Sequence, residues 1–165
     1  MIEQNRVCFT GHRKISVSIQ TRLRQVLEQQ IEALIYQGYQ IFMTGGALGF
    51  DTLAAALVLR LRQIHPQIEL HLAIPCGWQT RGWRAEDVRI YRMIQEQADF
   101  QINTFQPGDA FPMQTRNRYM VDHSDLCVAF QQHQKGGTAY TTRYAASRSI
   151  PIINLADFFV DDAGK

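Results

Sequence analysis

The stretch "MTGGALGFD" (43–51) combines a glycine-rich turn with a carboxylate, and it directly precedes an alanine-rich, helix-like run. Gly45, Gly46 and Gly49 allow the backbone to turn sharply and to approach a ligand closely. A helix that begins near Asp51 would point free amides at that ligand, which favours an anion. The GGxxG spacing matches neither the dinucleotide fingerprint nor the P-loop. Asp51 is interpreted either as a helix cap or as a partner for a ribose hydroxyl.

A second glycine turn, Gly136–Gly137, stands before Thr138 at the start of another helix-like segment. Thr138 can cap that helix or donate its hydroxyl to a phosphate. Two glycine-lined helix starts predict a ligand with at least one phosphate. The alternative for the second turn is a plain loop-to-helix connection.

The motif "TGHR" places Gly11, His12 and Arg13 after the first apolar run. Arg13 is suited to a phosphate, because a guanidinium binds phosphate oxygens in a bidentate manner. His12 is either a proton carrier or a residue that packs the loop. Gly11 lies beside both and belongs to the predicted ligand site.

The segment "QTRNRYMVDHSD" (114–125) predicts Arg116 and Asn117 in the first turn of a helix, with Asn117 facing inward to hold a loop or a ligand. Arg118 and Asp122 are four residues apart and are expected to pair on the helix surface. Asp122 and Asp125 flank the next predicted strand, and they are expected to orient the residues that contact the ligand without contacting it themselves.

Hydrolysis at the site would need an acid or a base near the leaving group. The candidates are Asp51, Asp109, Asp122 and His12, of which Asp51 is best placed beside the glycine turn. The helix dipole is expected to keep Asp51 charged, which suits binding of a hydroxyl group better than acid catalysis. Ligand binding is therefore favoured over catalysis.

The loop "PCGWQTRGW" (75–83) carries a cysteine and two tryptophans after the third apolar run. Cys76 is a candidate exposed thiol, whereas the other two cysteines are expected in the core. Trp78 and Trp83 would either stack on a base or pack beneath the loop. Histidines and cysteines show no metal-ligand spacing, so no metal is expected, and the sequence identifies no cofactor.

Apolar periodicity predicts strands and helices in alternation, which indicates a Rossmann-like, doubly wound α/β fold in one domain (1–165). The mainly parallel sheet of about six strands should have helices on both faces and its first strand in a central position. The unusual residues follow strands, and ligands of such sheets bind beyond the carboxyl ends of the strands. The expected strands are 6–10, 40–44, 68–74, 100–105, 126–130 and 151–155, and the expected helices are 18–37, 51–64, 84–97, 113–123 and 138–148.

The 165 residues carry a net charge of +2, from 17 basic and 15 acidic side chains, so charge gives no argument for nucleic acid and DNA is not an expected partner. Fourteen of the basic residues are arginines, which suits phosphate binding but equally fits arginine-rich coding. No apolar run approaches the roughly 18–20 residues of a membrane span. No signal peptide is recognised, and a cytoplasmic protein without a membrane partner is expected. A homo-oligomer is left open.

Five motifs occur in order along residues 6–155: "CFTGHR", "TGGALGFD", "AIPC…Q…W", "RNRYMVDHSD" and "GGTAYTTRYA". Together they resemble the YpsA-like family within the SLOG superfamily of Rossmann-like proteins. The resemblance implies a site for a nucleotide-derived small molecule, such as an ADP-ribose-like ligand, and it supplies no reaction. The residues to which it assigns this site are Gly45, Gly46, Gly49 and Asp51, with Arg13, Asn117, Gly137 and Thr138 nearby.

Two relatives in that superfamily provide alternative functions. LOG-type enzymes cleave the N-glycosidic bond of nucleoside monophosphates and carry a PGGxGTxxE motif. The corresponding stretch here, "KGGTAYTTR", lacks the proline, the GxGT spacing and the glutamate, which weakens the hydrolase hypothesis. DprA-type proteins use a related fold on single-stranded DNA, but this chain lacks their additional domains and a strong basic stripe.

Overall fold

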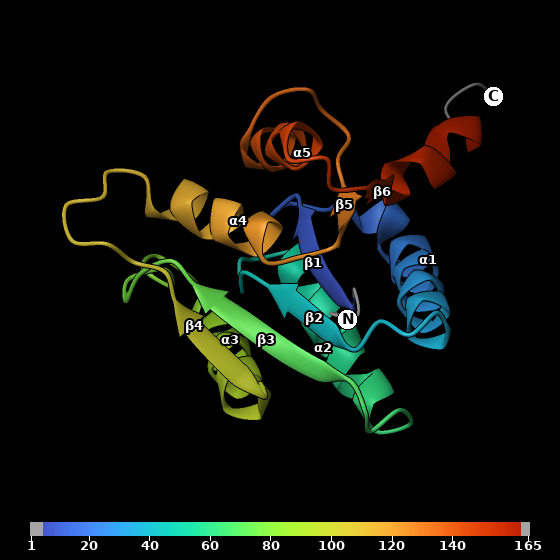
Figure 1. Cartoon of the computed structure of the whole chain (residues 1–165), viewed down its shortest axis with the longest axis horizontal. Helices are drawn as coiled ribbons and strands as arrows, with labels where there is room; N and C mark the ends of the chain where they lie inside the picture. Colours follow the sequence, from blue (N-terminus) through green and yellow to red (C-terminus); the bar gives the residue numbers. More distant parts are fainter. Residues whose placement is uncertain (1–4, 163–165) are drawn as a thin grey trace.

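The computed structural model describes residues 5–162, and these residues form a six-stranded parallel sheet with helices on both faces (Figure 1). The strands are β1 (Arg6–Gly11), β2 (Ile41–Thr44), β3 (Glu69–Ile74), β4 (Phe100–Asn103), β5 (Leu126–Phe130) and β6 (Ile152–Asn154). The helices are α1 (Val17–Tyr36), α2 (Phe50–Arg62), α3 (Ala85–Gln97), α4 (Pro112–Asp122) and α5 (Gly137–Ser147), followed by the 3₁₀ helix η1 (Leu155–Asp162). The predicted Rossmann-like α/β class is confirmed.

The strand order β4-β3-β2-β1-β5-β6 places β1 inside the sheet, as predicted. The chain winds outward from β1 through β2 and β3 to β4, and then returns to the other side of β1 to form β5. Val7 pairs with Leu126 and Gly11 with Phe130, so the carboxyl ends of β1 and β5 lie side by side. The direction of winding reverses between these two strands, and ligands of open α/β sheets bind at such a point.

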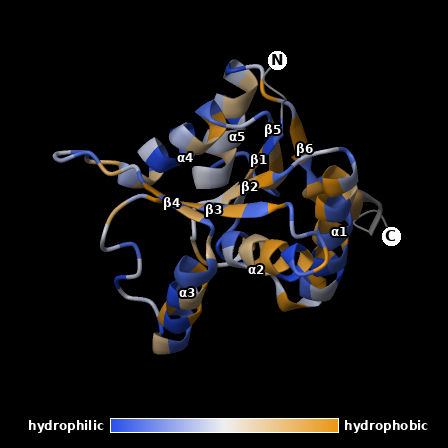
Figure 2. Cartoon of the chain, turned by 60° about the horizontal axis from the view of Figure 1, so that its bottom comes forward, coloured by the Kyte–Doolittle hydropathy of each residue, from blue (hydrophilic) through white to orange (hydrophobic). Residues whose placement is uncertain are grey.

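Two hydrophobic clusters hold the helices against the sheet. The larger cluster joins β1, β2 and β5 to α1 and α2, and it contains the contacting rings of Phe9, Phe42 and Phe50. The smaller cluster lies under α4 and α5 and contains Cys8 and Cys127, which are neighbours across β1 and β5. Figure 2 shows hydrophobic turns along α1 and α2, whereas α4 is mostly pale or blue. Helix α4 is therefore more polar than the two helices that pack on the larger cluster.

The predicted elements match the observed ones closely, with two local differences. The fourth strand ends at Asn103 rather than at 105, because the Thr104 hydroxyl donates to the Ile74 carbonyl and the chain turns away. The sixth strand has three residues and runs into η1, which the sequence pattern did not predict. Within residues 5–162, none of the helices has the length and hydropathy needed to cross a membrane.

Candidate functional site

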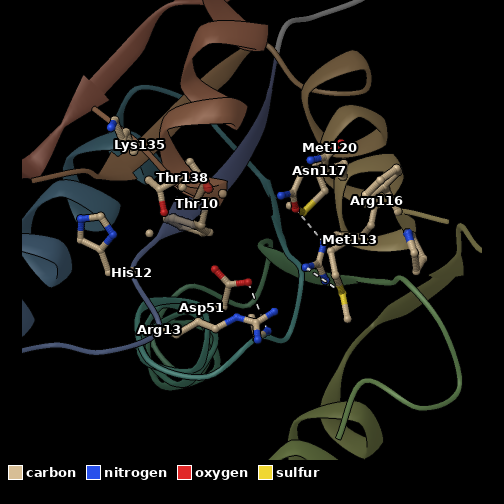
Figure 3. Close-up of a pocket in the computed structure, with 18 of the residues that line it drawn as sticks. Thr10, His12, Arg13, Asp51, Met113, Arg116, Asn117, Met120, Lys135 and Thr138 are labelled. Atoms are coloured by element: carbon tan, nitrogen blue, oxygen red, sulfur yellow. Dashed lines mark hydrogen bonds between the residues drawn. The ribbon is translucent and has the colours of Figure 1, made fainter. Parts of the chain in front are cut away.

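A cavity of about 470 Å³ lies at the carboxyl ends of β1 and β5 (Figure 3). Its walls come from the loop after β1, the first residues of α2, the start of α4 and the turn that opens α5. The structure brings nine predicted ligand residues to these walls: Gly11, His12, Arg13, Asp51, Arg116, Asn117, Gly136, Gly137 and Thr138. Gly45, Gly46 and Gly49 are not among the lining residues.

The start of α5 directs hydrogen-bond donors into open space at the cavity. The amide of Tyr140 donates to the carbonyl of Gly136, but no acceptor among the described residues meets the amides of Gly137, Thr138 or Ala139. Gly136 has φ +101°, and a Cβ atom at Gly136 or Gly137 would meet nothing within 4 Å. These amides and the helix dipole together form a place for an anion.

Two side chains add to this end of the cavity. Lys135 is exposed, lines the cavity and makes no hydrogen bond or ion pair with the described residues. Thr138 is buried at 7% exposure, and its hydroxyl does not cap α5. Lys135 was not among the predicted ligand residues, although its position directly before the glycine pair was a usable signal. The two side chains provide a cation and a hydroxyl beside the free amides.

At the glycine turn before α2, by contrast, several backbone amides already donate to acceptors within the protein. The amide of Phe50 donates to the carbonyl of His12 at 3.1 Å, and the amide of Ala47 donates to Oδ2 of Asp51 at 3.2 Å. The amide of Gly46 donates to a threonine hydroxyl at 3.3 Å. The amides of Gly46 and Ala47 are therefore not free for a phosphate, and those of Leu48 and Gly49, which meet no acceptor among the described residues, belong to residues that do not line the cavity.

The glycines of this turn are required by packing within the protein. A Cβ atom at Gly45 would lie 2.5 Å from the guanidinium of Arg116, and one at Gly46 would lie 2.9 Å from an aromatic ring. A Cβ atom at Gly49 would collide with the carbonyl of Arg13. The local pattern resembles a phosphate loop, but the close approach it allows is to the protein's own atoms.

Asp51 is the second residue of α2 and is 5% exposed on the cavity wall. Burial raises its pKa to about 6, and this outweighs the nearby charges of Arg116 and Arg13 and the amides of Ala47 and Gly45. Desolvation therefore opposes the stabilisation of the charged form that was expected from the helix dipole, although a carboxyl group with a pKa of about 6 is still mainly ionised at neutral pH. Asp51 does not cap α2, since its carboxylate accepts from the preceding turn.

Arg116 is 3% exposed and connects three parts of the structure. Its Nη1 donates to the carbonyl of Gly45 and to Oε1 of Gln79 at 3.2 Å, and its Nε donates to Oδ1 of Asn117 at 2.8 Å. Burial lowers the pKa of Arg116, and the charge of Asp51 opposes this. Arg116 and Asn117 lie in the second turn of α4, one turn later than predicted, because α4 begins at Pro112.

His12 links the loop after β1 to the loop before α5. The amide of Gln132 donates to Nε2 of His12 at 2.8 Å, and the His12 ring contacts the rings of Phe130 and His133. Burial and the neighbouring His133 lower the pKa of His12. This geometry supports the loop-packing interpretation of His12, while its ring still reaches the cavity wall.

An apolar wall faces these polar groups from the start of α4. Phe111, Pro112, Met113 and Met120 line the cavity, and the Phe111 side chain is 65% exposed. The sequence pattern did not identify this wall, because the exposure of these apolar residues toward the cavity depends on how α4 packs in the assembled fold. A planar base would find an apolar surface there.

The structure places several other candidates away from the cavity. Asp122 pairs with Arg148 and accepts from Tyr144, while Arg118 donates to Tyr140, so the expected Arg118–Asp122 surface pair does not form. These contacts join α4 to α5 rather than ordering the cavity.

Asp125 accepts the Arg6 amide at the amino end of β1, the end of the sheet opposite the cavity. Asp109 accepts from Thr115 and does not line the cavity. The expectation that Asp125 orders the site is therefore wrong, and Asp109 has no contact that favours catalysis.

The loop after β3 contributes no lining residue to the cavity. Cys76 is 2% exposed, so the expected exposed thiol is wrong. The Trp78 ring meets Phe105 and the Trp83 ring meets Tyr91, each edge to face. Packing is thus the observed role of both tryptophans. Among the described residues no group of three or more His, Cys, Asp or Glu is placed to hold a metal ion.

A family model described as the YspA SLOG family, named YpsA, matches residues 7–152. The chain belongs to the YpsA family. The YpsA-family protein is 34% identical over 131 residues to a UPF0398 protein of Halalkalibacterium halodurans, covering 78% of this chain and 69% of the relative. It is also 34% identical over 137 residues to the SPbeta prophage-derived protein YoqJ of Bacillus subtilis, covering 75% of this chain and 80% of that protein.

Two solved structures share the fold of this YpsA-family protein. DNA processing protein A of Helicobacter pylori, described for its single-stranded DNA binding mode, aligns with a TM-score of 0.64 at 17% identity over 90% of this chain. The corresponding Streptococcus pneumoniae protein aligns with a TM-score of 0.63 at 15% identity over 90% of this chain. The alignments span 63% and 49% of those longer chains. At this identity the similarity establishes the fold alone.

Proposed function

We propose that this YpsA-family protein binds a phosphate-bearing, nucleotide-derived small molecule in the cavity at the carboxyl ends of β1 and β5. The observation that carries the proposal is the pair of amides at Gly137 and Thr138, which meet no acceptor among the described residues and belong to residues that line the cavity beside Lys135. Amides at a helix start and an adjacent cation are a common arrangement for phosphate. The first phosphate of the ligand is assigned to this end.

The other walls suit the remainder of a nucleotide. A volume of about 470 Å³ lies within the usual range for small-molecule sites. The apolar wall of Phe111, Met113 and Met120 offers a surface for a base, and Asn117 and Asp51 offer partners for ribose hydroxyl groups. An ADP-ribose-like molecule combines these chemical groups, as does a simple nucleoside monophosphate.

Titration calorimetry with AMP, ADP-ribose and NAD tests the proposal. Lys135→Gln should weaken binding by roughly 10- to 150-fold, because a charge-assisted hydrogen bond contributes roughly 1.5–3 kcal/mol. Lys14→Gln is the matched control, since it removes the same charge from an exposed residue that does not line this cavity. No binding of these ligands at millimolar concentration by a folded sample would refute the proposal.

Cleavage of an N-glycosidic bond is a second candidate, and the observation that favours it is Asp51. A buried carboxyl group with a pKa raised to about 6 is suited to donate a proton to a leaving base. Incubation with nucleoside monophosphates and ADP-ribose should then release free base. Turnover that is lost in Asp51→Asn, while ligand affinity is retained, would establish an enzyme. Binding without turnover would support the binding function and contradict catalysis.

A further inference from the structure

Arg116 carries a buried positive charge that no carboxylate neutralises at close range. Among the described residues no acidic oxygen lies within the 4.0 Å of an ion pair, although the side chain is 3% exposed. Its oxygen acceptors are the neutral groups of Gly45, Ala73, Gln79 and Asn117. A buried guanidinium without a counter-ion is costly, and an anion that reached it would lower that cost.

One nitrogen of Arg116 remains available for such an anion. Among the described residues, the hydrogen-bond partner of its Nη2 atom is Sδ of Met113, at 3.9 Å, and a thioether sulfur is a weak acceptor. Both residues line the cavity, and Figure 3 shows the guanidinium on the side of the cavity formed by α4. The free donor of Arg116 is therefore close to the space that a ligand would occupy.

Arg13 adds a second cation to the same region. Its side chain makes no hydrogen bond or ion pair with the described residues, and Figure 3 shows it extending past Asp51 toward Arg116. The charge of Arg13 lowers the pKa of both Asp51 and Arg116, as expected for a nearby cation. Two guanidinium groups thus flank one carboxyl group, and positive charge is in excess.

This region is separate from the phosphate position at the start of α5. In Figure 3, Lys135 and Thr138 lie on one wall of the cavity, while the guanidinium groups of Arg13 and Arg116 lie across it, beyond Asp51. A ligand with one phosphate at α5 would leave the two arginines with Asp51 as the single nearby carboxyl group among the described residues, so positive charge would stay in excess. A ligand with a second anionic group at its other end would meet both positive regions.

We propose that the ligand carries two separated anionic groups, one at the start of α5 and the other at Arg13 and Arg116. The inference rests on the proposed nucleotide-binding function and specifies its ligand class: a nucleotide derivative with a second phosphate or a carboxylate away from the first phosphate. Asp51 lies between the two anion positions and faces the neutral body of the ligand, where it accepts from a hydroxyl or donates when protonated.

The test compares AMP with adenosine 3′,5′-bisphosphate and adenosine 2′,5′-bisphosphate by calorimetry at constant ionic strength. At least one bisphosphate should bind the wild-type protein roughly 10- to 150-fold more tightly than AMP does, the gain expected for one charge-assisted contact. Arg13→Gln should remove most of that gain. Lys135→Gln should weaken AMP and the bisphosphate by the same factor, so the ratio of their affinities stays unchanged.

Arg24→Gln is the matched control for Arg13→Gln, because Arg24 is an exposed arginine on α1 that does not line this cavity. It should preserve the full gain. If AMP binds and neither bisphosphate binds more tightly, the second anion position is refuted while the proposed function stands. An equal loss of the gain in Arg24→Gln would also refute it, since the effect would then reflect net charge. Failure of all three ligands to bind would refute the proposed function itself.

Discussion

The amide of Gln132 donates a hydrogen bond of 2.8 Å to Nε2 of His12, across 120 residues of sequence. Nε2 can accept only when the imidazole is neutral and carries its proton on Nδ1. Burial and His133 lower the pKa of His12 and so favour that neutral form. The bond joins the loop after β1 to the loop that carries Lys135, and it holds two walls of the cavity together.

The first prediction is that acid weakens ligand binding through His12. Because the pKa of His12 is lowered from 6.5, the bond to Gln132 is present above that lowered value and is lost as the pH falls through it. His12→Phe keeps a ring but has no acceptor, so it should bind ligand roughly 2- to 10-fold more weakly at neutral pH, the range for one hydrogen bond.

Titrations from pH 7.5 to pH 5 with wild type and His12→Phe check this prediction. The ligand's own phosphate titrates near pH 6, and its effect is common to both proteins. The ratio of the two affinities should therefore approach one in acid. His123→Phe, at the far end of α4, is the control and should behave as wild type. A ratio that stays constant with pH would show that His12 is not the titrating group.

The second prediction concerns Asp51 and stability. Its folded-state pKa is raised from 3.8 to about 6, so its contribution to stability is fully present below pH 3.8 and is lost as the pH rises through 6. The shift corresponds to about 3 kcal/mol at most. Asp51→Asn has no such titration and should become more stable relative to wild type by up to about 3 kcal/mol between pH 4 and pH 7.

Urea unfolding at several pH values measures this difference. A pH-independent difference between Asp51→Asn and wild type would contradict the prediction, because it would mean that the pKa of Asp51 is the same in the folded and the unfolded protein.

The third prediction contrasts two glycines. Gly45→Ala places a Cβ atom against the guanidinium of Arg116 and should destabilise the protein by about 1–3 kcal/mol, as overpacking does. Gly137→Ala meets open space and should change stability by less than about 0.5 kcal/mol. Its methyl group should nevertheless weaken ligand binding, because it enters the cavity beside the free amides. Thermal unfolding and calorimetry on both variants check this prediction. If Gly45 contacted the ligand instead, Gly45→Ala would weaken ligand binding and Gly137→Ala would leave it unchanged.

The fourth prediction is that single-stranded DNA is not a tight partner. The net charge of +2 gives little counter-ion release, although the fold is shared with a protein described for single-stranded DNA binding. Fluorescence anisotropy with labelled oligonucleotides at moderate salt should show no submicromolar affinity. Submicromolar binding that weakens steeply with salt would favour DNA over a small-molecule ligand.

The sequence predicts the fold well because its signals are local. The buried run "LCVAF" has the length of a strand, and Leu126–Phe130 form β5 with the predicted bounds. The alternation of strands and helices then restricts the topology, which correctly placed β1 inside the sheet. The 3₁₀ helix η1 was missed, because eight residues after a short edge strand show no distinct period.

The site is harder to predict because distant residues decide it. The two glycine turns have similar local sequences. The turn before α2 contacts the carbonyl of His12 and the guanidinium of Arg116, whereas a Cβ atom in the turn before α5 would meet nothing within 4 Å. Arg116 donates to the carbonyl of Gly45 across 71 residues of sequence, so no local sequence pattern predicts that contact. The sign of the pKa shift of Asp51 likewise depends on a burial that only the assembled fold produces.

The most direct test of the central claim follows backbone amides by ¹H–¹⁵N NMR while AMP or ADP-ribose is added to the wild-type protein. We expect the amide protons of Gly137 and Thr138 to shift downfield as they donate to a phosphate, and the amides of Gly46 and Ala47, which already donate within the protein, to move far less. Large shifts at Gly46 and Ala47 with none at the start of α5, or no shifts at saturating ligand, would contradict the central claim.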